Sequence, residues 1–302
     1  MIEHNRDSQH QTATAHTASS RKILTPPPLC AAAQLAGQPA PPCGGIPAAP
    51  LPLETDTPRA LLGGLAIAAM DRGAAARLLI SAARRRSGRP FYSTSANGEV
   101  IARVHADGNV AALFRDADQI LADGQPLVIA SRWLCRHKLP ERVATTDLFH
   151  DVAGIAERTG VSFYLFGATA GVNEKAAAVV RQLYPALSIV GRSHGYLAGA
   201  ELERKIDEIN GLGPDILWLG LGVPREQIFV RDFAGRLDRV GVIKTSGGLF
   251  DHLAGRTRRA PLWMQRAGFE WLWRAAMEPR RLFWRYLTTN PRALYVLLRY
   301  SR

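Results

Sequence analysis

From residue 57 to residue 248, short apolar runs alternate with stretches of helical periodicity, and this alternation constrains the fold more than any other feature. The run at residues 161–168 reads VSFYLFGA, and a helical pattern over residues 172–183 follows it. Apolar strands that alternate with helices predict an α/β fold, with a mostly parallel sheet and helices on both faces. The same pattern predicts the remaining strands at residues 91–96, 119–123, 187–191, 215–222 and 240–248.

The positive charge of the chain is concentrated at one end. The 302 residues carry a formal net charge of +12, and 47% of them are hydrophobic, which is typical of a globular protein. Residues 1–56 carry a net charge of −1, residues 57–255 carry +4, and residues 256–302 carry +9. A basic excess predicts a nucleic acid or an anionic membrane surface as partner. The near-neutral centre contains no recognisable DNA-reading helix or RNA motif, which makes nucleic acid the weaker hypothesis.

Composition divides the chain into three predicted parts. Residues 1–56 are rich in proline and alanine and have few large apolar side chains, so we expect a disordered tail. Residues 57–255 hold the predicted α/β core, and residues 256–302 form a predicted helical appendage in which all eleven basic residues are arginine. No apolar run reaches the roughly 18 to 20 residues that a membrane-spanning helix needs.

The predicted appendage combines arginine with tryptophan. Four of the six tryptophans lie in residues 261–300, and Pro279 and Pro291 should divide this segment into about three helices. Cationic and apolar side chains that interleave at helical spacing produce an amphipathic surface. Because tryptophan favours the lipid headgroup level and arginine attracts anionic lipid, we expect this segment to bind an anionic membrane surface.

Polar side chains follow several predicted strands, at the edge where open α/β sheets bind ligands. Asp123 ends one strand and precedes a glycine, and its carboxylate could serve as a general base or as the N-cap of the next helix. The spacing alone does not separate these two interpretations. Residues 222–227 also follow a predicted strand and place Glu226 and Gln227 at the start of a helix. Residues 245–251 follow the last predicted strand and contain glycines that allow close backbone approach.

The turn at residues 166–171 reads FGATAG and follows a strand, as a dinucleotide-binding loop would. It lacks the complete G-x-G-x-x-G pattern, and residues 191–194 read GRSH where an acidic residue is expected about 20 positions later. An NAD-dependent oxidoreductase is therefore disfavoured. A phosphate or nucleotide at this turn agrees with the sequence, because helix N-termini favour anions.

Nine short motifs follow one another in a fixed order between about Pro58 and Arg299. They read ANGEVI, LADG, RVATTDLF, YLFGA, HGY, LGVPREQ, SGGLFDHLAG, RAPLWMQRAGFEWLWR and EPRR. Together they resemble the WecG/TagA/CpsF glycosyltransferases, which form glycosyltransferase family 26. The resemblance implies a Rossmann-like core and a basic C-terminal appendage that helps to form the site and contacts the membrane. It also implies an inverting transfer, without a metal or other cofactor, from a UDP-sugar donor to a sugar linked to a polyprenyl diphosphate.

This resemblance makes a glycosyltransferase of exopolysaccharide, capsule or related envelope glycan synthesis the leading hypothesis. Such an enzyme would bind peripherally to the cytoplasmic face of the bacterial inner membrane, with a homo-oligomer as a further expectation. UDP-glucose and UDP-N-acetylmannosamine are both candidate donors, and nothing in the sequence separates them. The acceptor sugar and the linkage stay equally open.

The resemblance also implies roles for single residues. Asp123 matches the proposed catalytic base, and Asn97 and Ser95 match a polar pair on the neighbouring strand end that should hold acceptor or donor. The other matched residues are Gly167, Tyr196 and Asp251 in the nucleotide pocket, and Arg274 and Arg281 as arginines that neutralise the diphosphate.

The chain departs from the family pattern in two ways. The family commonly reads Pro-Lys-Gln-Glu where this chain has Pro224 followed by Arg225, Glu226 and Gln227, so the Gln and Glu are exchanged. An ionised Glu cannot donate a hydrogen bond, which changes the contacts that this pair can make with a donor sugar. Trp284 stands where a third appendage arginine is expected, and an arginine follows it directly.

Overall fold

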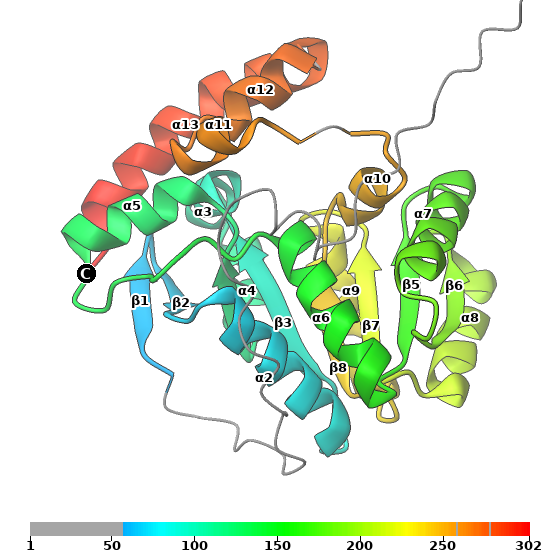
Figure 1. Cartoon of the computed structure of the whole chain (residues 1–302). Helices are drawn as coiled ribbons and strands as arrows, with labels where there is room; N and C mark the ends of the chain where they lie inside the picture. Colours follow the sequence, from blue (N-terminus) through cyan, green and yellow to red (C-terminus); the bar gives the residue numbers. More distant parts are fainter. Residues whose placement is uncertain (1–56, 258, 278) are drawn as a thin grey trace, which may run out of the picture. The chain divides into compact units, whose positions relative to one another are not determined.

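The computed structural model describes residues 57–257, 259–277 and 279–302, with the backbone alone at residues 279–283 and 285 (Figure 1). The predicted tail lies outside the described residues. The described residues all belong to one compact unit.

The centre of this unit is a six-stranded sheet in which every pair of neighbouring strands is parallel. The strand order is β4-β3-β8-β7-β5-β6 (Figure 1). The prediction of a mostly parallel, Rossmann-like α/β sheet is therefore confirmed. The strands are β3 (Phe91–Ala96), β4 (Gln119–Ala122), β5 (Phe163–Gly167), β6 (Ile189–Ser193), β7 (Ile216–Gly220) and β8 (Val242–Thr245).

Helices connect these strands and cover both faces of the sheet (Figure 1). Those of the predicted core are α2 (Arg72–Arg85), α3 (Gly98–Ala106), α4 (Gly108–Arg115), α5 (Gln125–Leu134), α6 (Thr145–Thr159), α7 (Ala170–Leu183), α8 (Gly199–Leu212), α9 (Arg225–Phe233), the short 3₁₀ helix η1 (Ala234–Arg236) and α10 (Leu249–Leu253). Those of the C-terminal segment are α11 (Leu262–Arg266), α12 (Glu270–Met277) and α13 (Pro279–Tyr300).

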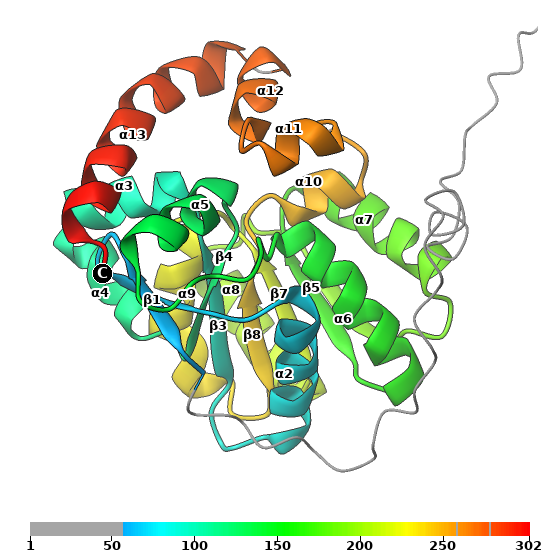
Figure 2. The same ribbon diagram turned by 60° about the vertical axis from the view of Figure 1, so that its left-hand side comes forward.

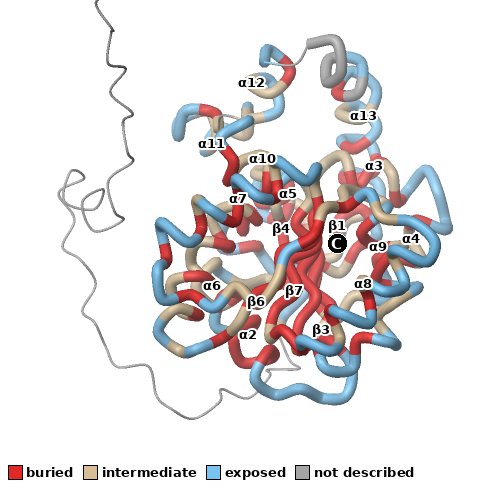
Figure 3. The backbone as a smooth tube through the Cα atoms, turned by 90° about the vertical axis from the view of Figure 1, so that its right-hand side faces the viewer, coloured by how far each residue is buried: buried red, intermediate tan, exposed pale blue. Residues whose placement is uncertain are grey.

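Strand β5 has a continuous apolar sequence because both of its faces are buried. Phe163 and Leu165 pack in one cluster with residues of α2, α6 and α7, whereas Tyr164 and Phe166 pack in another with residues of α8 and α9. Trp218 on the neighbouring strand β7 lies with its ring centroid 5.7 Å from that of Phe163. A parallel strand that is buried on both faces needs apolar side chains at successive positions. Figure 3 shows these buried strands between helices with exposed outer surfaces.

An antiparallel hairpin precedes the sheet, and the sequence analysis did not predict it. Its strands are β1 (Arg59–Leu62) and β2 (Leu65–Ala68). Gly63 and Gly64 form the connecting turn with φ values of +56° and +86°, and two successive positive φ values are typical of a type I′ hairpin turn. Ile67 is buried among residues of α3, α4 and β4, so the hairpin extends the core at one end of the sheet.

The segment after residue 261 forms three helices that lie over the carboxyl edge of the sheet (Figure 2). The prediction that Pro291 separates two helices is wrong, because Pro291 lies inside α13. A proline inside a helix removes a backbone hydrogen bond. Val296 and Leu297 are buried in a cluster with residues of α3, and this packing supports a continuous helix. The division into a core of residues 57–255 and an appendage of residues 256–302 stays a prediction.

Candidate active site

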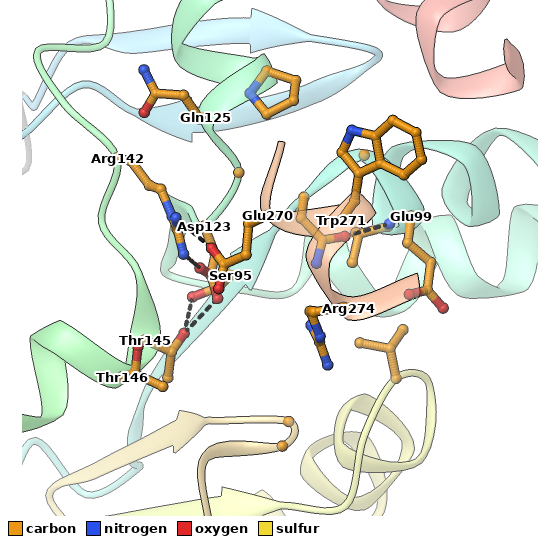
Figure 4. A pocket seen from close by; sticks show the side chains of 18 of the residues that line it. Ser95, Glu99, Asp123, Gln125, Arg142, Thr145, Thr146, Glu270, Trp271 and Arg274 are labelled. Atoms are coloured by element: carbon orange, nitrogen blue, oxygen red, sulfur yellow. Dashed lines mark hydrogen bonds and ion pairs between the residues drawn. The ribbon is translucent and has the colours of Figure 1, made fainter. Parts of the chain in front are cut away.

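A cavity of about 250 Å³ lies where strands β3, β4 and β8 end. The core forms one wall, and helices α12 and α13 contribute to the other (Figure 4). Because open α/β sheets bind ligands at this edge, the cavity is the candidate active site. Its charged and amide-bearing lining comprises Asn97, Glu99, Asp123, Gln125, Arg142, Glu226, His252, Gln265, Glu270, Arg274 and Asn290.

Asp123 follows strand β4 and directs its carboxylate into this site (Figure 4). Its backbone N–H donates to the carbonyl oxygen of Ala96 at 2.8 Å, which fixes the loop to the neighbouring strand. Thr145 Oγ1 donates to Asp123 Oδ2 at 3.1 Å, and a guanidinium nitrogen of Arg142 lies 3.7 Å from Oδ1. Helix α5 begins after Gly124 without a side-chain cap, so the interpretation of Asp123 as an N-cap is wrong.

The protein environment makes Asp123 a stronger base than an exposed aspartate. Desolvation raises the pKa of its carboxyl above the ordinary value, because burial penalises the charged form. Arg142, Thr145 and Lys244 oppose this rise in the pKa, and Glu270 adds slightly to it. The side chain is still 28% exposed, which leaves it accessible from the cavity. A reachable carboxylate with a raised pKa suits proton abstraction from a hydroxyl.

Arg142 connects the core to the C-terminal helices. One of its terminal nitrogens forms an ion pair of 2.6 Å with a carboxylate oxygen of Glu270 on α12, while its other terminal nitrogen lies near Asp123. The Arg142 side chain is only 14% exposed, so water screens these contacts weakly. Arg259 makes a second connection with Asp147 on α6. These ion pairs join the segment that carries α11 and α12 to the core.

Ser95 and Asn97 line the same cavity, at the end of strand β3. Ser95 Oγ lies 3.2 Å from Thr145 Oγ1 and accepts a hydrogen bond of 2.9 Å from Lys244 Nζ. Asn97 Oδ1 accepts from the backbone N–H of Val100 at 3.1 Å, so this side chain caps helix α3. The structure thus brings both residues to the site, and their contact with substrate stays a prediction.

Glu226 and Gln227 lie at the start of helix α9 and are buried, with 3% and 1% exposure. Glu226 Oε2 accepts from the backbone N–H groups of Gly222 at 3.2 Å and Gly247 at 3.0 Å, which ties the loop after β7 to the loop after β8. Glu226 borders the cavity, whereas Gln227 is not among the lining residues and donates to Thr94 at 3.3 Å. Both side chains therefore support the loops, and their contact with a donor sugar stays a prediction.

The predicted nucleotide-binding residues lie outside the lining of this cavity. Gly167 ends strand β5 and Tyr196 follows strand β6, and a backbone hydrogen bond of 2.9 Å joins the loops that carry them. Tyr196 is 65% exposed, and the guanidinium carbon of Arg225 lies 5.6 Å from its ring centroid. Asp251 lies on α10 with Arg256 3.9 Å away. The structure therefore brings Gly167 and Tyr196 to neighbouring strand ends, and a nucleotide site there stays a prediction.

The predicted diphosphate-binding arginines lie on the C-terminal helices. Arg274 on α12 lines the cavity, whereas the side chain of Arg281 lies outside the described residues. Trp284, in the position of the expected third arginine, is 67% exposed. In the described part of the chain, the Nε atoms of Arg274 and Arg142 are buried without a hydrogen-bond partner. Buried donors without partners are groups that an anionic ligand would satisfy.

Four charged or hydroxyl residues at this site were not predicted from the sequence, namely Arg142, Thr145, Lys244 and Glu270. Arg142 and Thr145 lie within the motif RVATTDLF, so the motif itself was the signal. Lys244 lies within the apolar strand β8 and is fully buried. A lysine in a strand that reads as buried is uncommon and could have been recognised as a candidate site residue.

A parallel α/β sheet with a carboxylate and arginines at its carboxyl edge defines an enzyme of the α/β class with a site suited to an anionic ligand. The sequence pattern of the glycosyl transferase WecG/TagA/CpsF family matches residues 60–302. The chain belongs to this family and is a glycosyltransferase.

Curated relatives share most of their length with this chain. A protein of Bacillus subtilis (strain 168) is 30% identical over 205 residues, which are 68% of this chain and 78% of the relative. A protein of Staphylococcus aureus (strain MW2) is 28% identical over 192 residues, which are 64% of this chain and 74% of the relative. Both relatives are named N-acetylglucosaminyldiphosphoundecaprenol N-acetyl-beta-D-mannosaminyltransferase.

Proposed function

We propose that this chain transfers a sugar from a UDP-sugar to a sugar carried on a polyprenyl diphosphate. The observation that carries the proposal is the position of Asp123, whose carboxylate faces a cavity also lined by Arg142 and Arg274. The names of the relatives support the acceptor class, because they describe N-acetylglucosamine on undecaprenyl diphosphate.

The proposed reaction is a single displacement at the anomeric carbon of the donor. The Asp123 carboxylate takes the proton of the acceptor hydroxyl while the hydroxyl oxygen forms its bond to the anomeric carbon. The bond from that carbon to UDP breaks, and UDP leaves with the electron pair. Attack from the face opposite UDP inverts the anomeric configuration. Arg274 offsets the negative charge that develops on the leaving diphosphate.

We assign the remaining predicted residues by their places around the sheet edge. Ser95 and Asn97 lie in the cavity with Asp123 and are suited to hold the reacting sugars. Gly167 and Tyr196 lie at the ends of β5 and β6, where a nucleotide would find an aromatic ring and the nearby Arg225. Asp251 on α10 and Arg281 on α13 are assigned to the same nucleotide and diphosphate by the family resemblance.

The identity of the donor is the first point to test. The relatives' names favour N-acetylmannosamine, and UDP-glucose is the alternative donor. The full-length protein should be assayed with UDP-N-acetylmannosamine, UDP-glucose and UDP-N-acetylglucosamine, each with N-acetylglucosamine diphosphate on a short polyprenol. Transfer of one of these sugars with inverted configuration is expected. Absence of transfer from every UDP-sugar, with the acceptor present, would refute the proposal.

We further propose that the C-terminal helices bind the surface of a membrane that holds the lipid-linked acceptor. None of the described helices is long and apolar enough to span a bilayer. Helix α11 nevertheless exposes Leu262 and Trp263 by 69% and 66%, and α13 exposes Leu294 and Leu298 by 59% and 63%. Exposed apolar side chains beside exposed arginines suit an anionic lipid surface. A peripheral position on the cytoplasmic face, where envelope glycan precursors are assembled, belongs to the same proposal.

A further inference from the structure

Lys244 is a buried charged residue beside this site that takes no part in the proposed chemistry. It lies in strand β8 and is fully buried. Its ammonium group donates to Ser95 Oγ at 2.9 Å and to the backbone carbonyl oxygen of Thr245 at 2.9 Å. A buried lysine is costly unless nearby groups compensate its charge. The groups that surround the Lys244 ammonium therefore indicate what its positive charge does in the site.

Two carboxylates in the same part of the site face Lys244 from different elements. Asp123 approaches from the end of strand β4 and Glu226 from helix α9, and both interact electrostatically with the ammonium group. Burial lowers the pKa of Lys244 to about 8, and the two carboxylates oppose this fall. The ammonium form therefore predominates at neutral pH. Lys244 supplies positive charge between one carboxylate at the reacting centre and one that holds the loops after β7 and β8.

Hydrogen bonds connect Lys244 to Asp123 through two hydroxyl groups. Ser95 Oγ lies 3.2 Å from Thr145 Oγ1, and Thr145 Oγ1 lies 3.1 Å from Asp123 Oδ2 (Figure 4). An ammonium group can only donate, so Ser95 Oγ must accept from Lys244. The Ser95 hydroxyl is then free to donate to Thr145, and the Thr145 hydroxyl donates to the Asp123 carboxylate. The ammonium group at one end and the ionised carboxylate at the other thus together fix the direction of this chain of hydrogen bonds.

We propose that Lys244 is a positioning residue for Asp123. Through Ser95 and Thr145, Lys244 holds the Asp123 carboxylate ionised and oriented toward the acceptor hydroxyl. This inference rests on the proposed role of Asp123 as the base.

The charged groups around Asp123 determine how strongly Lys244 changes the pKa of Asp123. Arg142, from the loop before α6, is the larger source of positive charge, and Glu270 on α12 opposes it. Replacing Lys244 therefore removes one cation that lowers the pKa of Asp123 and leaves Arg142 in place. Because Ser95 and Thr145 separate Lys244 from Asp123, we expect Lys244 to lower the pKa of Asp123 less than Arg142 does.

The test is the pH dependence of kcat/KM for Lys244→Met in the full-length protein. Loss of the ammonium group should raise the pKa of Asp123, so the acid limb of the profile should move to higher pH by about one unit. Lys175→Met, which changes an exposed lysine on α7, should keep the wild-type limb. If Lys244→Met leaves the acid limb where it is in the wild type, the proposal is wrong, because a purely structural role would lower the rate without moving the limb.

A second variant keeps the test decisive if the single change prevents folding. Glu226→Gln combined with Lys244→Met removes two opposite buried charges together, which proteins tolerate better than loss of one of them. The same displaced acid limb is expected, and a wild-type limb in this double variant would also overturn the proposal.

A direct titration of Asp123 tests the role of Lys244 independently of the proposed sugar transfer. The ¹³C carboxyl resonance of Asp123, assigned by its loss in Asp123→Asn, reports the pKa without turnover. A higher pKa in Lys244→Met supports the coupling even if no tested donor is transferred. An unchanged pKa overturns the coupling even if transfer is observed.

Discussion

Replacing Gly167 by alanine should destabilise the whole domain, because Gly167 lies where two strands meet closely. Its φ is +144°, which side chains rarely allow. A Cβ atom at this position would lie 2.2 Å from the carbonyl oxygen of Gly220 and 2.8 Å from its Cα. Ordinary contact for such atoms is about 3.5 Å, so the ends of β5 and β7 would have to separate by about 1 Å.

The expected cost combines two terms. Backbone strain at this φ contributes about 1–3 kcal/mol, and overpacking against rigid backbone contributes a similar amount. Displacement of Gly220 would also weaken the hydrogen bond of 3.1 Å that its carbonyl oxygen accepts from the N–H of Ala168. We therefore expect Gly167→Ala to lower the free energy of unfolding by about 3–5 kcal/mol. For a domain of this size the melting temperature would fall by about 10 °C.

Denaturant unfolding followed by circular dichroism measures this loss. Gly154→Ala is the matched control, because Gly154 lies inside helix α6 and an added Cβ would meet only the end of the Arg158 side chain at 4.0 Å. The free energy of unfolding of Gly154→Ala should rise by about 0.5–1 kcal/mol, because alanine favours a helix interior more than glycine does. An unfolding midpoint for Gly167→Ala equal to that of the wild type would refute the close-approach argument and favour a role in nucleotide binding alone.

Three further predictions concern the site and the membrane. Arg142→Met should move the acid limb of the pH profile of kcat/KM to higher pH by about one unit or more, because Arg142 is the cation that lowers the pKa of Asp123 most. An acid limb at the wild-type pH would show that Arg142 does not control this pKa. Leu262→Ser combined with Trp263→Ser should weaken binding to phosphatidylglycerol vesicles about tenfold in a sedimentation assay, and equal binding would exclude α11 as a membrane contact. Excess EDTA should leave turnover unchanged, whereas a loss that Mg²⁺ or Mn²⁺ restores would contradict the expected metal-independent reaction.

The elements that the sequence predicted well are those with local signals. The run at residues 91–96 is strand β3 with the same bounds, and the apolar run before Asp123 is strand β4. Because ligands bind at the carboxyl edge of such sheets, Asp123 could be placed at a site before its contacts were known, and the family resemblance added Ser95 and Asn97.

Contacts between distant parts of the chain had no such signal. The pairing of Arg142 with Glu270 depends on how the C-terminal helices pack over the core, and periodicity does not encode it. Pro291 reads as a helix breaker, yet packing of α13 against α3 keeps the helix continuous. The hairpin turn at Gly63 and Gly64 joins strands of only four residues each, too short for a clear alternation of apolar residues.

The central claim is that Asp123 removes the proton from the acceptor hydroxyl. The most direct test compares turnover and UDP-sugar affinity in Asp123→Asn with those of the wild type and of Asp207→Asn, which changes an exposed aspartate on α8 that pairs with Arg236. Asp123→Asn should lower kcat about 10²- to 10⁴-fold and change the Kd of the donor by less than about twofold, while Asp207→Asn retains full activity. Turnover near the wild-type rate in Asp123→Asn would contradict the account.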